Sequence, residues 1–251
     1  MSLLLAGAGA TAFCFAQGFV RLRRRGRADH ASWARAALFA LGLAAAVVPL
    51  LLPLDGRLST HMLEHVLVGD VAPALVLVAL RGPLLVFCVP QALHGLRHAL
   101  APLLRPAVAL GVWMAALAAW HVPAAYEYAL HHPAAHELEH ASFALGGVLV
   151  WVQLIDPARR RRLSAVRRLA FAGVLFGCGQ LLGDVLFLTK PLYASYPTAS
   201  DQQGAALVMM AEQTLVLGTF AALLAWSRLR QTAGKPAVRS AVPSARIANA
   251  S

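Results

Sequence analysis

Seven apolar segments, each long enough to cross a lipid bilayer, restrict the folds that are open to this chain. A transmembrane helix needs roughly 20 mostly apolar residues. Hydrophobic residues make up 59% of the sequence and charged residues only 13%, whereas soluble domains carry about 25% charged residues. We therefore predict an all-α integral membrane bundle of seven transmembrane helices, over residues 3–20, 36–54, 60–80, 107–126, 138–155, 169–188 and 205–226.

Two of the apolar segments need a separate interpretation. Residues 83–93 are short and contain two prolines, so we expect them to lie in a loop or at the membrane interface. The arginines near residues 3–20 follow the apolar run, which is the wrong order for a cleaved signal peptide. We predict one transmembrane domain over residues 1–228 and a basic, disordered cytoplasmic tail over 229–251.

Twenty of the 22 lysines and arginines lie after the first, third, fifth and seventh apolar segments. Only Arg57 and Lys190 lie in the other connections. Because basic residues accumulate on the cytoplasmic side, we predict an outside N-terminus and a cytoplasmic C-terminus. The net charge of +11 then reflects topology, so membrane lipid is an expected partner and nucleic acid is not.

The predicted outer side collects seven of the ten histidines, six acidic residues and two basic residues. Imidazoles and carboxylates with little positive charge form an environment that suits transition metals. His131 and His132 lie in a short connection, where exposure to solvent is the simpler expectation. The remaining histidines on this side are the candidate metal ligands: His61, His65, His121, His136 and His140.

Four of these histidines repeat one pattern. Residues 61–65 and 136–140 both read H-x-x-E-H, so in each repeat the two imidazoles lie on one face of a helix. Both predicted helices run inward from the outer side, which places the two pairs at similar depth. We predict that they converge on a metal ion. Copper, as Cu(I) or Cu(II), and zinc are both compatible with these donors.

Neighbouring side chains are expected to assist this site. Glu64 and Glu139 can orient the imidazoles or ligate the metal directly. Met62 carries a thioether that suits Cu(I), and Met209 is a second such group nearby. Asp201 is a further candidate on the same side.

Three carboxylates fall inside the predicted membrane segments: Asp70, Asp184 and Glu212. Such groups are costly to bury and are therefore functional candidates. They can form an ion path through the bundle, or the last two can hydrogen-bond to Gln180 and Gln213. The first interpretation leaves open a transporter of metal ions or other cations.

Residues 136–140 also match H-E-x-x-H, the pattern of zinc peptidases. A peptidase needs a third ligand and a substrate cleft, and the sequence shows no recognisable third-ligand motif. We predict no catalytic residue and no enzymatic activity. Cys14, Cys88 and Cys178 lack C-x-x-C spacing and are expected to be packing residues.

Several motifs together resemble one family, the CtaG-type cytochrome c oxidase assembly proteins of bacteria, over roughly residues 50–226. The motifs are His61-Met62-x-x-His65, Trp120-His121-x-Pro123-x-x-Tyr126, His136-x-x-Glu139-His140, Pro191-Leu192-Tyr193-x-x-Tyr196 and Asp201-Gln202-Gln203. The resemblance implies a polytopic membrane protein that helps copper reach a haem–copper oxidase. Cytochrome c oxidase subunits are the implied partners, and a periplasmic copper chaperone is a further candidate.

Two other functions remain open at this stage. One is the cation transporter, which predicts cation flux in proteoliposomes that depends on Asp70. The other is a redox protein with a bis-histidine haem, which predicts a Soret band. Haem ligands usually pair deeper in the bilayer, whereas these histidines lie near helix ends.

Overall fold

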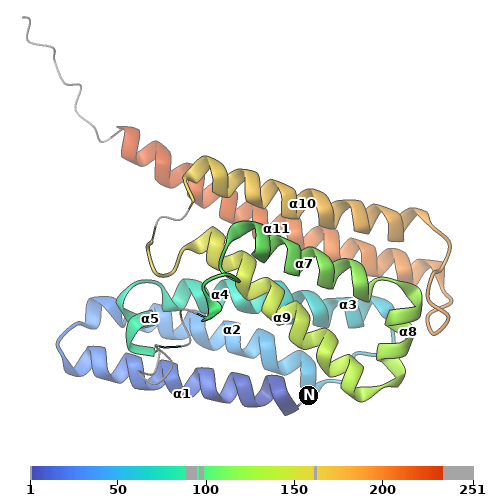
Figure 1. Ribbon diagram of the computed structural model, residues 1–251, viewed down its shortest axis with the longest axis horizontal. Coiled ribbons are helices and arrows are strands. Elements are labelled where there is room, and N and C mark those ends of the chain that lie inside the picture. The colour runs from blue at the N-terminus through green and yellow to red at the C-terminus, as the bar shows by residue number, and fades with distance from the viewer. Residues whose placement is uncertain (1, 89–94, 96–98, 161–162, 234–251) are drawn as a thin grey trace, which may run out of the picture.

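The computed structural model describes residues 2–88, 95, 99–160 and 163–233, and every regular element in these ranges is a helix. Figure 1 shows an elongated bundle in which most helices lie alongside one another. The main helices are α1 (Ser2–Arg24), α2 (Trp33–Leu51), α3 (Leu58–Val66), α4 (Ala72–Leu80), α5 (Pro83–Cys88), α7 (Pro106–Trp120), α8 (Pro123–His131), α9 (Pro133–Ile155), α10 (Ala165–Leu188) and α11 (Ala199–Ala233). The predicted all-α class is confirmed.

Within the described ranges, six segments are long and apolar enough to cross a membrane. They are Leu3–Arg24, Ala28–Leu51, Leu58–Leu80, Pro133–Ile155, Ala165–Leu188 and Ala199–Arg230. Helices α7 and α8 pass the same test only as a pair, which is bent by 79°. The chain is therefore a multi-pass membrane protein with six continuous candidate spans and one bent pair.

The prediction of one continuous helix over 107–126 is wrong. Helix α7 ends at Trp120, and α8 begins at Pro123. Proline lacks an N–H group and disfavours the helical conformation in the residue before it. Val122 accordingly has an extended backbone, with φ −67° and ψ 124°.

Other predicted boundaries shift by shorter stretches. Helix α2 ends at Leu51, two residues before Pro53. Helix α11 continues to Ala233, past the boundary predicted at residue 228. The rest of the predicted tail, 234–251, and the residues 89–93 of the short apolar segment lie outside the described residues.

Three buried clusters hold the bundle together. One joins α1, α2, α4 and α5 around Phe15 and Phe39, whose rings stack 3.8 Å apart. A second joins α4, α9, α10 and α11 around Trp151 and Leu154. The third joins α3, α8, α10, α11 and the connection after α10, and it includes Tyr126. Cys14 and Cys88 pack with the first cluster and are free thiols.

A short π-helical segment, η2 (Leu67–Val71), separates α3 from α4. Pro73 has no N–H to donate to the carbonyl of Gly69 four residues earlier, which favours a local change in the helix. Gly69 contacts α9 at Gly147, where an added Cβ atom would overlap the Gly69 carbonyl. Such π segments occur often at functional sites, and this one follows the first histidine repeat directly.

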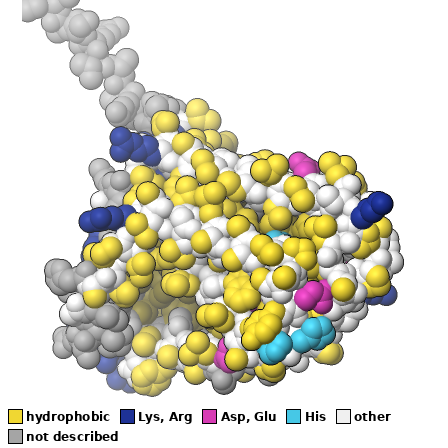
Figure 2. Space-filling model, turned by 45° about the vertical axis from the view of Figure 1, so that its right-hand side comes forward, with side chains coloured by type: hydrophobic (Ala, Val, Ile, Leu, Met, Phe, Trp, Pro, Cys, Tyr) yellow, Lys and Arg dark blue, Asp and Glu magenta, His cyan; other side chains and the backbone are white. Residues whose placement is uncertain are grey.

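The charged side chains are divided between the two ends of the bundle. Figure 2 shows lysine and arginine mainly at one end of the visible face, while histidine and most acidic side chains lie toward the other. The first histidine repeat begins α3 and the second lies near the beginning of α9, and these two helix starts lie at the same end in Figure 1.

Candidate metal centre

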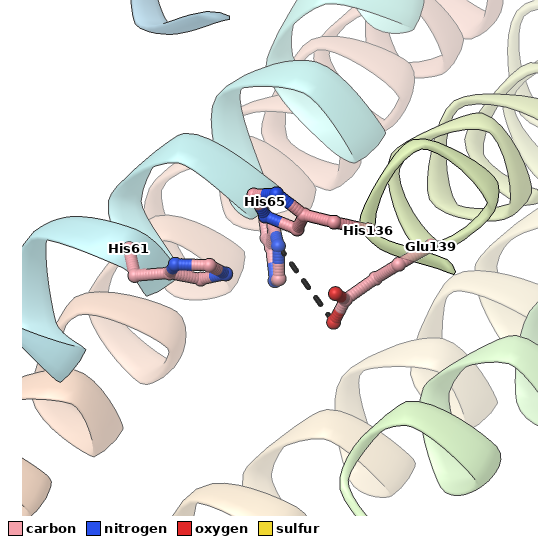
Figure 3. Close-up of side chains that lie close together, drawn as sticks. All are labelled: His61, His65, His136 and Glu139. Carbon is pink, nitrogen blue, oxygen red and sulfur yellow. Dashed lines mark ion pairs between the residues drawn. The ribbon is translucent and has the colours of Figure 1, made fainter. Parts of the chain in front are cut away.

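Four side chains from two helices bring metal-ligating atoms together. His61 and His65 project from α3, and His136 and Glu139 project from α9 (Figure 3). One ligand atom from each lies within 4.8 Å of the other three. We call this group the His/Glu cluster. The structure thus places the two H-x-x-E-H repeats face to face.

The cluster is buried, yet several of its polar atoms have no hydrogen-bond partner. His61 and Glu139 are each 1% exposed, and His65 is 6% exposed. The unpartnered atoms are Nε2 of His61, both ring nitrogens of His65, Nε2 of His136 and Oε1 of Glu139. Leaving a buried polar group unsatisfied costs about 1–3 kcal/mol. Imidazole and carboxylate donors in this state fit a transition-metal ion.

The other two members of the repeats complete a crossed arrangement. Nε2 of His140 lies 3.1 Å from Oε1 of Glu64, and Nε2 of His65 lies 3.8 Å from Oε1 of Glu139. Each pair joins a histidine of one helix to a glutamate of the other. The His140 ring lies 4.9 Å from the His65 ring and 4.4 Å from the His136 ring. His140 and Glu64 therefore border the His/Glu cluster directly.

Asp55 also belongs to this site, although the sequence did not single it out as a site residue. Nδ1 of His61 donates a hydrogen bond to Oδ1 of Asp55 at 2.9 Å. This hydrogen bond holds the pKa of the Asp55 carboxyl below its usual value. It also fixes the His61 tautomer, so that the lone pair of Nε2 is available to a metal. One feature of the sequence could have identified Asp55: it is an acidic residue in a proline- and glycine-containing turn just before the first histidine repeat.

His121 was predicted to join the other histidines, but it lies apart from the His/Glu cluster. It follows the last residue of α7, and its Nδ1 donates to the carbonyl of Leu117 at 2.8 Å. It lines a cavity of about 60 Å³ that His65 also lines. The bend between α7 and α8 gives His121 this position.

Asp201 does not join the cluster either. Its carboxylate accepts hydrogen bonds from the backbone N–H of Leu58 at 2.7 Å and of Ser59 at 3.1 Å. It also accepts one from the Ser59 hydroxyl at 2.7 Å. Asp201 therefore caps the beginning of α3 from the beginning of α11 and holds the helix that carries the first repeat.

Replacing Asp201 by alanine is expected to destabilise the protein by about 1–2 kcal/mol, because the first N–H groups of α3 lose their acceptor. Thermal unfolding of the purified protein in detergent measures this loss. Ser200→Ala is the matched control, since Ser200 is an exposed neighbour on the same helix. An unchanged stability together with lost metal would instead identify Asp201 as a ligand.

The three carboxylates predicted inside the membrane separate into a pair and a single residue. Asp70 lies in η2 and accepts a hydrogen bond from the Trp151 indole N–H. The carboxyl groups of Asp70 and Glu212 are hydrogen-bonded to each other. Asp184 is exposed on α10 and does not line the cavity that the pair lines.

The connection between α10 and α11 supports the site through two tyrosines. The Tyr196 hydroxyl donates to the backbone carbonyl of Asp55 at 2.7 Å, and the Tyr193 hydroxyl donates to that of His121 at 3.3 Å. Burial raises the pKa of Tyr196 to about 12, so this hydroxyl remains a donor. Gln202 in turn accepts from the N–H of Leu192 at 2.7 Å and anchors the connection.

The Glu137 side chain contacts helix α1. Its Oε1 accepts a hydrogen bond from the backbone N–H of Leu3 at 2.5 Å, which ties the beginning of α9 to α1. The peptidase pattern H-E-x-x-H requires this glutamate at the metal, and Glu137 is not in the His/Glu cluster.

Comparison with known proteins adds one finding. The family model described as cytochrome c oxidase caa3 assembly factor matches residues 13–231. No curated protein and no solved structure matches the chain. The matched range contains both histidine repeats, His121, the two tyrosines of the connection and the Asp70–Glu212 pair. Since it covers most of the sequence, the chain belongs to the family of cytochrome c oxidase caa3 assembly factors.

Proposed function

We propose that this assembly factor binds copper at the His/Glu cluster on the outer face of the bacterial inner membrane and aids its delivery to the oxidase. The proposal is supported above all by four buried or half-buried donors within 4.8 Å of one another. Buried polar atoms without hydrogen-bond partners are rare in proteins, and a bound ion would satisfy the unpartnered atoms of this cluster. The role is binding and transfer, without catalysis.

The donor set favours copper over the harder cations. Magnesium and calcium prefer sites made of oxygen donors, whereas imidazoles suit copper and zinc. Three of the four donors of the cluster are imidazoles. A haem–copper oxidase needs copper, so membership of an oxidase assembly family makes copper the expected cargo rather than zinc.

The placement of charge supports an outer position for the cluster. Twenty of the 22 basic residues lie in the connections at the other ends of the predicted membrane segments or in the C-terminal tail, and basic residues mark the cytoplasmic side. A cluster on the outer face is accessible to periplasmic copper proteins, and subunits of the oxidase can receive the ion there.

The decisive experiment uses a host whose oxidase activity depends on this protein. We expect the wild-type chain to restore an oxidase with its copper, while His61→Ala and His140→Ala fail although they are present in the membrane at normal levels. His132→Ala is the matched control, because His132 is an exposed histidine outside the cluster. Full oxidase assembly with both the His61→Ala and the His140→Ala variant would refute the proposal.

The same host tests the peptidase alternative. Glu137→Gln is expected to support normal oxidase assembly, because Glu137 contacts α1 rather than the cluster. A loss of assembly, with Glu137→Gln protein at normal levels and with unchanged copper content, would favour a catalytic role for Glu137.

Removing the Asp55 carboxylate is expected to weaken copper binding by about 10- to 100-fold, the usual effect of losing a group that orients a metal-binding histidine. The Asp55→Ala protein is titrated with copper against a competing chelator. Asp29→Ala is the control, because Asp29 pairs with His30 in the connection between α1 and α2. Equal affinities for wild type and Asp55→Ala would show that His61 needs no such support.

A further inference from the structure

A small cavity lies beside the His/Glu cluster and has a chemistry of its own. Its volume is about 60 Å³, whereas pockets for organic ligands measure about 300–1,000 Å³. Water takes about 30 Å³ in the liquid, so the cavity has room for one or two waters or for a single dehydrated ion. The side chains that give it chemical character are Met62, His65, Asp70, His121, Met209 and Glu212.

His121 offers this cavity a prepared metal ligand. Its Nδ1–H is used in the hydrogen bond to the carbonyl of Leu117, so Nε2 carries a lone pair. This Nε2 is buried and has no hydrogen-bond partner. Metal-binding histidines typically donate their other ring N–H to a carbonyl or carboxylate in this way. The Tyr193 hydroxyl holds the backbone of His121 in addition.

Two thioethers line the same cavity as His121. Met62 on α3 is 1% exposed and Met209 on α11 is 6% exposed, and both belong to the buried cluster around Tyr126. Thioether sulfur is a soft donor that favours Cu(I) over Zn²⁺ and over hard cations. Two thioethers with an imidazole therefore form a softer set of donors than the imidazoles and carboxylate of the His/Glu cluster.

The charge of the cavity suits a cation. The carboxyl groups of Asp70 and Glu212 both line it. Opposite charges attract strongly where water is excluded, so such groups favour a bound cation. Among the described residues that line the cavity there is no lysine or arginine, so a bound cation would meet no competing positive charge.

We propose that this cavity is a second metal site, which binds Cu(I) through Nε2 of His121 and the sulfurs of Met62 and Met209. The Asp70–Glu212 pair balances the charge of the ion. The site extends the proposed copper function, because His65 lines the cavity and also belongs to the His/Glu cluster. Binding involves no change of oxidation state.

The test uses the full chain in lipid nanodiscs, loaded anaerobically with Cu(I) against a competing chelator. We expect about two copper equivalents per chain, with sulfur scattering in the copper X-ray absorption spectrum, since the cavity supplies thioethers and the His/Glu cluster contains none. The Met62→Leu/Met209→Leu double variant keeps the side-chain volume nearly constant. It is expected to lose one equivalent and the sulfur signal. Met114→Leu is the matched control, because Met114 is 41% exposed on α7.

Two more variants keep the outcome decisive. His121→Ala should also lose one equivalent, and its metal-free thermal unfolding shows whether the fold is retained. His136→Ala should lose the other equivalent and keep the sulfur signal.

The results separate this site from the His/Glu cluster. A single equivalent without sulfur scattering in the wild type, or a sulfur signal that survives in the double variant, would overturn the cavity site and leave the cluster standing. A single, sulfur-bound equivalent that His136→Ala does not affect would support the cavity site and refute copper binding at the cluster.

Discussion

Replacing His65 by leucine is expected to lower the affinity for copper by at least about 100-fold while the metal-free protein stays as stable as the wild type or becomes more stable. His65 is 6% exposed, and neither ring nitrogen has a hydrogen-bond partner. A leucine fills much of the same space without unsatisfied polar atoms. The stability of the apo protein and its affinity for metal should therefore change in opposite directions.

Two measurements check this result. Copper affinity is obtained by competition with a chelator, and the midpoint of thermal unfolding is measured on metal-free protein. His132→Leu serves as control, because it introduces the same apolar side chain at an exposed histidine. A large loss of apo stability in His65→Leu would instead show that the imidazole is a structural element whose partners matter without metal.

Replacing Gly147 by alanine is expected to destabilise the fold by about 3 kcal/mol or more. A Cβ atom at this position would overlap the backbone carbonyl of Gly69 and approach the ring of Pro73. Backbone atoms in two packed helical segments cannot move aside as a flexible side chain can. The substitution should therefore push α9 away from η2 and disturb the His/Glu cluster, which α3 and α9 carry.

The matched control for this variant is Gly111→Ala on α7, where an added Cβ meets no atom within 4 Å. Alanine favours helix over glycine by about 1 kcal/mol, so this control should be neutral or slightly stabilising. Thermal unfolding and monodispersity on gel filtration compare the two proteins. Equal stability of the two variants would mean that α9 and η2 can separate without penalty.

Much of the fold could be predicted because the membrane imposes it. Long apolar runs have few alternatives to helices in a bilayer, and the helices α1, α2, α9 and α10 lie close to the predicted segments. The four-residue spacing of the histidines likewise fixed which side chains share a helix face. The break after Trp120 escaped prediction because the segment over 107–126 was predicted from its length and apolar composition, which do not reveal the local effect of Pro123 on the backbone.

The surroundings of the site could not be predicted, because they depend on contacts between distant parts of the chain. Asp201 caps α3 from a position more than 140 residues later in the sequence. Asp70 meets Glu212 across the bundle, and nothing in either local sequence indicates the partner. His121 lines a cavity outside the His/Glu cluster because the bend between α7 and α8 sets its position. The spacing of residues in the sequence does not reveal this bend.

The crossed contacts between α3 and α9 are reciprocal, as contacts around a local two-fold axis are. Rotation about such an axis exchanges His61 with His136, Glu64 with Glu139 and His65 with His140. It converts the His65–Glu139 contact into the His140–Glu64 contact. If the cluster binds an ion away from this axis, as proposed above, the same symmetry gives a second position for the ion that shares His61 and His136. The Asp55 carboxylate hydrogen-bonds to His61 and makes the two positions unequal, so the proposed site would offer a bound ion one preferred position next to a second one.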